Sequence, residues 1–560
     1  MKTSYSIIIA LVLCFTGYSF AQFGPHDLFI PEPTTLQYLN DLIMADSLAN
    51  GARVDSERVY VLERGGVYLI NTNIRNSNWT LRIKAQDTLG TKPVIYLIRN
   101  ASTNTLPTRA VEVRGSMWLK NIIVCGYTEA NPALISDING ALFTETTAGW
   151  DITIDSCIFT NSSGNHIRTD AAPRVVKVTN SIFANMGYLG TSNLGAGKAI
   201  DLRSGSCDSL IFVNNTFVNW QDRIIRHYSS TANIKYMLFD HNTLVNGMSY
   251  HGMLSLGRTG SNMIITNNLF IDPFALGNDS DAIRQAEFGD GGELDTWGGA
   301  RMSWVISVPN DSTQWTISNN YYTITPAGQE FFDSASVRPI VANPPLTAGS
   351  MLTHHINGKL GADSATAFTN TTIALTNVPS LMTNMMVWYR KPLADSGGNK
   401  SKVTTYFKAA YDYDRRGFQY YRDTLDCTYP TLHAAYTGAE GGFPVGDLNW
   451  FPSQKTLWEI WSSLDVRISD EIPTAFALKQ NYPNPFNPTT RIVYSVPGES
   501  KIRLEVYDML GRSVATLVDE VKQAGEYAAT FDGAGLPSGI YVAKLSSDEI
   551  LLVRKMMLVK

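Results

Sequence analysis

The sequence predicts an all-β protein that consists of a parallel β-helix, or solenoid, followed by a small β-sandwich. The chain has 560 residues, which exceeds one ordinary core and favours several domains or a repeat array. Only 17% of the residues are charged, and Asn, Thr, Ser, Gly and Tyr are abundant, which suits β-structure with long turns. A short β-run that ends in a polar pair also recurs through the central part of the chain, and this repeat indicates a solenoid.

The N-terminus predicts export. Met1 and Lys2 form a positive start, residues 7–15 form an apolar run, and residues 19–21 form a cleavage site of the small-x-small kind. We therefore expect residues 1–21 to be a signal peptide that is removed after Ala21. The apolar run is well short of the ~18 residues that a membrane span needs, and no later segment qualifies as a transmembrane segment of the mature chain.

Charge and cysteine spacing argue against two kinds of ligand. The net charge is -5, so no domain-wide basic excess exists to neutralise the phosphates of a nucleic acid. No Cys/His spacing typical of a zinc site is present. The cysteines that remain after export allow up to two disulfides, but most lie in or beside apolar strand-like segments, which favours small buried core residues. These cysteines are Cys125, Cys157, Cys207 and Cys427.

Residues 22–337 are expected to form the β-helix, with a capping helix at its entrance. Thr34 and Thr35 are N-cap candidates for this helix. Its apolar positions are Leu36, Leu39, Leu42, Ile43 and Leu48. Short β-runs follow it along the chain. A short amphipathic helix suits the first coil of a solenoid, since the apolar end of that coil would otherwise be exposed.

The repeat has six clear copies, which read DITIDSCIF, VVKVTNSIF, LIFVNNTFV, MLFDHNTLV, MIITNNLFI and WTISNNYYT. The first polar residues of the pairs are Asp155, Asn180, Asn214, His241, Asn267 and Asn319, at spacings of 25, 34, 27, 26 and 52 residues. The last spacing is close to two coils, one of them unmarked. Strands that recur at this period stack in parallel about 4.8 Å apart, so equivalent side chains form ladders. We expect an inward Asn at this bend to bond the backbone and the Asn of the next coil.

This pattern resembles the pectate-lyase-like right-handed parallel β-helix superfamily over roughly residues 59–325. The resemblance implies the architecture and leaves the reaction open. From residue 338 to 470 the repeat fades, and we interpret this region as the exit and cap of the β-helix. Its stretch GGFPVGDLNWFP, at residues 441–452, resembles a segment found at the end of β-helices in secreted Bacteroidota proteins. The aromatic residues of this region are expected to be core, with a carbohydrate-binding unit as the alternative.

Residues 471–560 hold the most specific motifs of the chain. They include NYPNPFNPTT, IRLEVYDMLGRSV, AGEYAATFD and LPSGIYVAKL, in which alternating strands are broken by turn residues. These motifs resemble the type A C-terminal sorting domain of the type IX secretion system, which is an Ig-like β-sandwich. The resemblance implies that the secretion machinery is a partner and that the protein is secreted or lies on the outer-membrane surface. An ordinary Ig-like binding module would explain the strands but not the NYPNPFNP lead-in.

A basic edge is predicted where the second strands of successive coils should lie. Arg168, Arg203, Arg226 and Arg258 each precede the next polar pair by a similar distance, and Lys198, Arg223 and His227 lie nearby. Guanidinium groups bind carboxylates or sulfates, so such an edge would bind an anionic polysaccharide. If the edge is catalytic, Lys198 is the candidate base, Arg226 neutralises the uronate carboxylate and His227 assists. Arg168, Arg203, Arg223 and Arg258 would then bind substrate.

The sequence holds two further patterns of charged residues besides this basic edge. The arginines have acidic neighbours in the sequence, Asp170, Asp201, Asp208 and Asp222, and could form a structural charge ladder with them. A pair such as Asp201 and Asp222 could also serve glycoside hydrolysis. A Gly-rich loop at residues 276–299 is a candidate Ca²⁺ site, with solvated acids as the alternative. Its acidic residues are Asp279, Asp281, Asp290, Glu293 and Asp295.

The sequence therefore favours an extracellular polysaccharide-active β-helix protein, and most of all a lyase that acts on a uronate-containing glycan. The alternative is a non-catalytic, glycan-binding or adhesive surface protein, and a glycoside hydrolase ranks below both.

Overall fold

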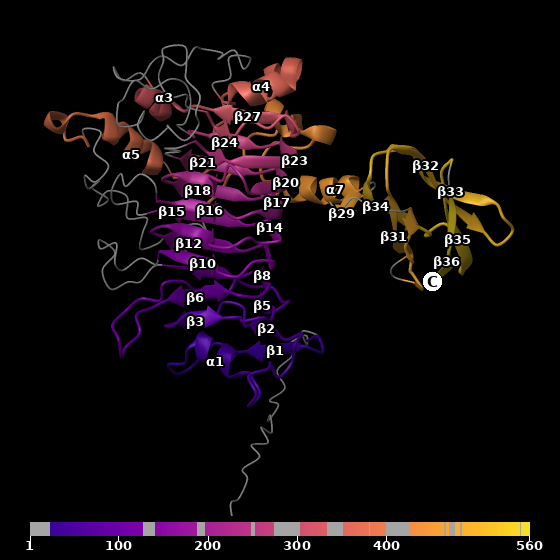
Figure 1. Cartoon of the computed structure of the whole chain (residues 1–560), viewed down its shortest axis with the longest axis horizontal. Coiled ribbons are helices and arrows are strands. Elements are labelled where there is room, and N and C mark those ends of the chain that lie inside the picture. Colours follow the sequence, from indigo (N-terminus) through magenta and orange to yellow (C-terminus); the bar gives the residue numbers. More distant parts are fainter. Residues whose placement is uncertain are drawn as a thin grey trace, which may run out of the picture.

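The structure is a computed structural model, which describes residues 23–126, 140–187, 196–247, 252–273, 303–332, 351–379, 381–398, 425–463, 466–469, 476–481, 484–548 and 550–559. A long stack of parallel strands is followed by a unit of antiparallel strands (Figure 1). The predicted all-β class, a parallel β-helix and then a sandwich, is confirmed. Within these ranges no helix is long and apolar enough to cross a membrane. The predicted signal peptide lies outside them.

Three parallel sheets, named here A, B and C, form the walls of the solenoid (Figure 1). Sheet A consists of β1 (Asp27–Ile30), β2 (Val59–Leu62), β5 (Leu81–Ala85), β8 (Met117–Lys120), β11 (Asp151–Asp155), β14 (Val175–Thr179), β17 (Cys207–Val213), β20 (Asn233–Asp240), β23 (Arg258–Thr266) and β26 (Gln314–Ser318). Sheet B consists of β3 (Val67–Ile70), β6 (Val94–Leu97), β9 (Ile123–Cys125), β12 (Ile158–Ser162), β15 (Ile182–Met186), β18 (Thr216–Trp220), β21 (Thr243–Gly247), β24 (Leu269–Ile271), β27 (Asn320–Thr323) and β28 (Phe368–Asn370). Sheet C consists of β4 (Ile74–Arg75), β7 (Val111–Val113), β10 (Ala141–Glu145), β13 (Asn165–Thr169), β16 (Lys198–Arg203), β19 (Arg223–His227), β22 (Leu254–Ser255) and β25 (Val305–Ile306).

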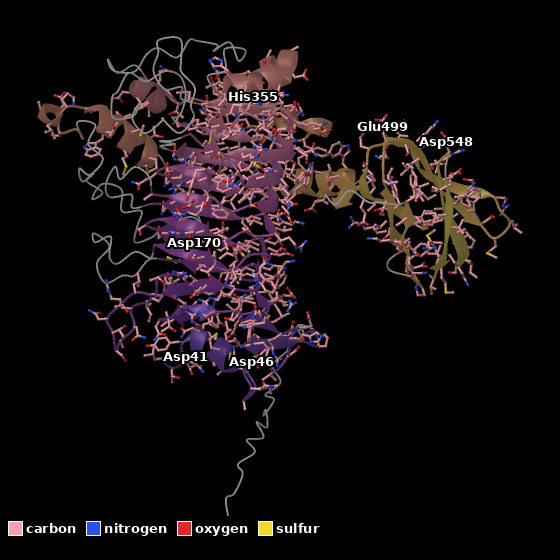
Figure 2. The ribbon with its side chains drawn as sticks, in the orientation of Figure 1. Asp41, Asp46, Asp170, His355, Glu499 and Asp548 are labelled. Carbon is pink, nitrogen blue, oxygen red and sulfur yellow. The ribbon has the colours of Figure 1, made fainter. Side chains whose placement is uncertain are left out.

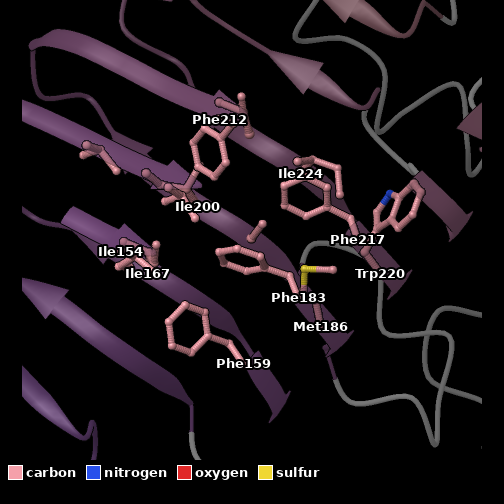
Figure 3. Packing of buried hydrophobic residues seen from close by; sticks show 14 of the residues in the cluster. Ile154, Phe159, Ile167, Phe183, Met186, Ile200, Phe212, Phe217, Trp220 and Ile224 are labelled. Atoms are coloured by element: carbon pink, nitrogen blue, oxygen red, sulfur yellow. The ribbon is translucent and has the colours of Figure 1, made fainter. Parts of the chain in front are cut away.

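Apolar side chains from all three sheets fill the inside of the solenoid as one cluster. Phe159, Phe183 and Phe217 follow one another on successive coils of sheet B, with ring centroids 5.2 and 5.1 Å apart (Figure 3). Ile167 and Ile200, which pair in register on sheet C, are fully buried in the same cluster. Such aromatic pairs add about 0.5–1.5 kcal/mol each beyond the burial of their area. The interior is therefore a packed core, and a ligand site has to lie on an outer face.

An asparagine ladder runs inside the bend between sheets A and B. Asn215, Asn242, Asn268 and Asn320 are buried on successive coils. The side-chain oxygen of Asn242 accepts from the amide and the side-chain nitrogen of Asn215, at 3.1 and 3.0 Å, and the pattern repeats up the stack. Asn268 contacts Asn320 directly, because β24 pairs with β27. The predicted unmarked coil between them is therefore wrong, because the strands of the two marked coils pair directly.

The ladder uses the second polar residue of each pair, whereas the first was predicted. The first residues occupy a left-handed turn, with φ between 50° and 60° at Asn180, Asn214, His241, Asn267 and Asn319. Asn tolerates this conformation better than most residues. Asp155 was assigned one residue too early, because Ser156 takes the left-handed position in that coil at φ 57°.

A second left-handed position follows five residues after the first, at the end of sheet B. It is occupied by Asn161, Asn185, Asn219, Asn246 and Asp272, with φ between 48° and 61°. The side chain of Asn185 donates to the oxygen of Asn161 at 2.8 Å, and that of Asn219 donates to Asn185 at 3.1 Å. This column of amides was not predicted, although an Asn or Asp recurs at this offset in five copies of the repeat.

The entrance of the solenoid is covered by α1 (Leu39–Ala45). The predicted capping helix is confirmed, but it begins after Tyr38 and not after Thr34 or Thr35. Tyr38 is extended because it forms a parallel bridge with Leu69 of the first coil. Leu39 and Ile43 are buried as expected, whereas Leu36 and Leu48 are exposed.

Helices α3 (Pro326–Phe332), α4 (His354–Leu360) and α5 (Leu381–Arg390) follow the last coils. The described chain from residue 425 to 451, which we call the strap, then lies along the outer face of sheet B and holds the short 3₁₀ turns η6 (Ala434–Thr437), η7 (Glu440–Gly442) and η8 (Leu448–Trp450). Tyr429, Phe443 and Phe451 of the strap are buried against sheet B, so these three aromatic residues are core as predicted, whereas Trp461 is exposed. Helix α7 (Pro452–Ser463) leads from the strap towards the sandwich (Figure 1).

Two antiparallel sheets form the C-terminal sandwich. One consists of β29 (Val466–Ser469), β30 (Ala477–Leu478), β31 (Thr489–Val496) and β34 (Gly525–Asp532), and the other of β32 (Ser500–Asp508), β33 (Ser513–Lys522), β35 (Gly539–Ser546) and β36 (Leu551–Leu558). Alternate residues such as Tyr494, Leu504 and Leu545 form its core. The predicted turn after β32 is confirmed, because the Asp508 carboxylate accepts the amides of Leu510 and Arg512, at 2.9 and 3.0 Å.

Candidate functional site

The predicted basic edge maps onto the outer face of sheet C, but it alternates basic and acidic residues. Parallel pairing stacks Arg75, Glu112, Thr144, Arg168, Asp201, Arg226 and Ser255 in one register, which we call the charge column. The Arg226 guanidinium lies 3.3 Å from the Asp201 carboxylate, and Arg75 lies 2.9 Å from Glu112. Arg168 pairs with Asp170 at 2.7 Å, on the flank of the solenoid where Figure 2 labels Asp170. Each predicted arginine in this column therefore already has a carboxylate partner.

The candidate base Lys198 lies in a buried ion cluster beside the charge column. Its ammonium is 2.7 Å from one Asp222 oxygen, and the Arg223 guanidinium is 3.4 Å from the other. Arg223 also donates to the Ser255 hydroxyl at 2.8 Å. All three charged side chains are at most 4% exposed. Buried charges of this kind require each other, since removal of one partner leaves an uncompensated charge.

His227, the candidate assisting residue, is fully buried. Its Nδ1 lies 2.8 Å from the Leu256 carbonyl oxygen and its Nε2 lies 3.0 Å from that of Gly205. Burial lowers the pKa of His227, and the two carbonyl contacts offset part of that effect. Both ring nitrogens are thus engaged by the backbone, so the imidazole holds two coils together and does not face a ligand.

The remaining predicted residues do not share one edge. Arg203 follows a bulge in the pairing of β16, and its backbone takes φ 54°. Arg258 is the first residue of β23 and pairs with Asn233, so it belongs to sheet A. The single edge of four arginines is therefore wrong, because the turn before β23 is too short to keep Arg258 on sheet C. Exposed Tyr228 lies under the Arg226 guanidinium, with 4.7 Å between the Arg226 Cζ atom and the ring centroid.

The predicted Ca²⁺ ligands, Asp279, Asp281, Asp290, Glu293 and Asp295, lie outside the described residues. Across the ranges that the structure describes, no group of three or more His, Cys, Asp or Glu side chains is placed to hold a metal ion. The described cysteines are buried, as expected for core residues: Cys125, Cys157, Cys207 and Cys427.

An open groove with a volume of about 500 Å³ lies on the outer face of sheet A. Its floor and walls come from four successive coils, through outward side chains of β2, β5, β8 and β11. Half-buried Trp118 lies in it, between Arg82 on the coil before and Thr153 on the coil after. Thr80 and Ser116 add hydroxyl groups to the lining. An aromatic ring surrounded by a few polar groups is the usual composition of a sugar-binding groove.

The charges around this groove are also balanced. The Arg82 guanidinium contacts the Glu57 carboxylate at 2.8 Å, and Asp151 pairs with Arg174. Asp151 has a second role in the groove, since its backbone amide donates to the Ser116 hydroxyl at 3.2 Å. Its Oδ1 atom is shielded from solvent and has no hydrogen-bond partner among the described residues.

Sequence reasoning did not find this groove. Trp118 stands between the inward residues Met117 and Leu119. A strict in-out alternation around these two apolar residues would have placed the Trp118 ring on the outside of sheet A. The signal was available, but no role was predicted for Trp118.

Comparison with known proteins bears on the C-terminal unit. A family model described as a secretion system C-terminal sorting domain matches residues 480–560. No curated protein matches the chain, and no solved structure matches it. The match confirms the predicted type IX sorting domain and its partner, the secretion machinery. The protein is therefore exported and is either secreted or attached to the outer-membrane surface. The family match does not include the solenoid, and the pectate-lyase-like resemblance stays a prediction.

Proposed function

We propose that the exported β-helix binds a polysaccharide outside the cell and does not cleave it. The observation that carries this proposal is the open groove on sheet A, which half-buried Trp118 lines together with Thr80, Ser116 and Thr153. Sugar rings pack their C–H faces on aromatic rings while their hydroxyls need polar partners around the rim. Export by the sorting domain brings this face into contact with extracellular glycans.

A lyase, which the sequence favoured, receives less support from the geometry. Elimination from a uronate needs a base that reaches the substrate and a cation that neutralises the carboxylate. Lys198 is buried and ion-paired to Asp222, and Arg226 is paired with Asp201. A hydrolase built on Asp201 and Asp222 has the same difficulty, because both carboxylates are 1–2% exposed and each is held by a cation.

Incubation of the full mature protein with a panel of polysaccharides tests the proposal. The panel contains alginate, pectate, glycosaminoglycans and neutral glucans, xylans and mannans. We expect retarded migration in affinity gels with at least one polysaccharide, no rise in the ultraviolet absorbance of unsaturated uronate, and no new reducing ends. A rise in absorbance would establish a lyase, and new reducing ends without it would establish a hydrolase. The absence of retardation with every member of the panel contradicts polysaccharide binding.

A further inference from the structure

We infer that the groove on sheet A takes a neutral polysaccharide whose chain runs along the solenoid axis, across the coils. This inference rests on the proposed function and adds the class and direction of the ligand. It departs from the anionic ligand that the sequence favoured, because that expectation depended on basic residues that the structure shows in ion pairs.

The outer face of sheet A is extended along the solenoid axis. Parallel pairing places Arg82, Trp118, Thr153, Lys177, Ile211, Leu238, Ile264 and Thr316 in one register on the outer face of sheet A, which we call the outer column. One side chain recurs per coil, at a spacing of about 4.8 Å. This spacing is comparable with the length of one pyranose unit in an extended glycan. A chain along the column would therefore present successive sugars to equivalent positions.

Beyond the groove, the outer column includes apolar side chains. Ile211, Leu238 and Ile264 follow one another on three coils and remain half-buried on a face that the strap does not cover. They form a strip of apolar side chains in the outer column, beyond Thr153 and Lys177. The apolar faces of sugar rings fit such a strip, whereas the carboxylates or sulfates of a polyanion would lose hydration against it without a partner.

The charged groups beside the groove also favour a neutral ligand. The cations that border the groove are already neutralised: Arg82 by Glu57, Arg174 by Asp151, and Lys120 by Asp155 at 3.7 Å. A polyanion would have to displace these carboxylates, while a neutral glycan leaves the pairs in place. Lys177 is exposed and forms no ion pair with a described residue, so it provides an internal test of the charge of the ligand.

Isothermal titration of the full mature protein with hexasaccharides tests this inference. The neutral probes are the β-linked glucose, xylose and mannose hexamers, and the anionic probes are oligogalacturonate and oligoalginate. We expect a neutral hexamer to bind with an affinity that is insensitive to salt, because no ion pair forms in the complex. Trp118→Ala should weaken this affinity at least about tenfold, which is about 1.4 kcal/mol, while Trp118→Phe retains most of it.

Three further variants locate the ligand and test its charge. Lys177 lies in the outer column, so Lys177→Ala should keep the affinity for the neutral hexamer insensitive to salt, as in the parent protein. Tyr228→Ala, on the sheet C face, should leave that affinity unchanged. Thr153→Arg fills the groove without removing Trp118, and it should abolish binding even if Trp118→Ala fails to fold.

The outcomes separate this inference from the function on which it rests. Binding of anionic probes alone, with loss in Lys177→Ala or Tyr228→Ala, overturns the neutral ligand but keeps polysaccharide binding. Binding of a neutral hexamer that is indifferent to Trp118→Ala and Thr153→Arg overturns the site. Failure of every hexamer, together with failure of every polymer in the panel, overturns the proposed function itself.

Discussion

The outer faces of sheets C and A both carry charged residues but differ in how these residues are paired and buried. On sheet C, Lys198, Asp222 and Arg223 are almost fully buried and compensate one another. On sheet A, pairs such as Arg82–Glu57 are partly exposed and border an open groove. A run of basic residues in a solenoid sequence therefore does not by itself indicate an anion site. Such residues hold coils together where acidic residues occupy the adjacent coils.

The largest expected effect comes from breaking the buried cluster on sheet C. Asp222→Ala leaves Lys198 and Arg223 without their carboxylate and should lower the free energy of unfolding by about 3–5 kcal/mol. Asp151→Ala, on sheet A, removes a partly exposed pair and should cost less than about 1 kcal/mol. Chemical denaturation of both variants provides the measurement. Equal losses would show that the two faces do not differ in this respect.

The second largest effect is a pH dependence of the free energy of unfolding, which arises from a residue of sheet C. Glu145 of β10 is fully buried, and burial, with a contribution from nearby Asp170, raises its pKa from 4.5 to about 8. The folded protein therefore keeps a proton that the unfolded chain releases above pH 4.5, so stability falls as the pH rises from 4.5 to about 8. The loss should reach about 3 kcal/mol near neutral pH. Glu145→Gln should flatten the profile of unfolding free energy against pH, and an unchanged slope would assign it to other groups.

The third effect is local to the bend that joins sheets A and B. Asn242→Ala removes the acceptor for two Asn215 donors and the donor to the Phe212 carbonyl, and leaves buried groups unpaired. We expect a loss of about 2–3 kcal/mol in the free energy of unfolding. Hydrogen exchange should show faster exchange of the Asn215 amide than in the parent protein. Protection that stays at the parent level would mean that another acceptor replaces Asn242.

The smallest effect on stability is expected in the groove. Trp118→Ala removes a half-buried ring from the outer face and should change the free energy of unfolding by less than about 1 kcal/mol, while it abolishes most of the affinity for the glycan. Thermal unfolding with and without the neutral hexamer measures both quantities. The parent protein should gain stability from the ligand and the variant should not. A large loss of unfolding free energy in Trp118→Ala without ligand would show that Trp118 belongs to the core. Sheet A would then differ less from sheet C in the stability that its outer residues contribute.

The architecture could be predicted because strand length, alternation and the polar pair are local in sequence. The position of the inward ladder could not, since Asn214 and Asn215 are both asparagine and only the left-handed φ of Asn214 decides which one points inward. The pairing of charges could not be predicted either, because Asp201 and Arg226 are brought together only by the register of two adjacent coils. Residues 480–560 were identified correctly because sorting motifs are contiguous and need no knowledge of register.

The strap gives the solenoid a property that a simple stack of coils lacks. Its backbone contacts the side chains at three successive left-handed turns. The amides of Leu448 and Glu440 donate to the side-chain oxygens of Asn214 and Asn267, and the Gly446 carbonyl lies within hydrogen-bond distance of the His241 ring. Repeat proteins with contacts between neighbours alone unfold in segments and fray from their ends. A chain segment that ties three coils at once opposes such partial opening, so these coils should unfold as one cooperative unit. For a protein exposed to extracellular proteases, that would remove the partly open states at which cleavage begins.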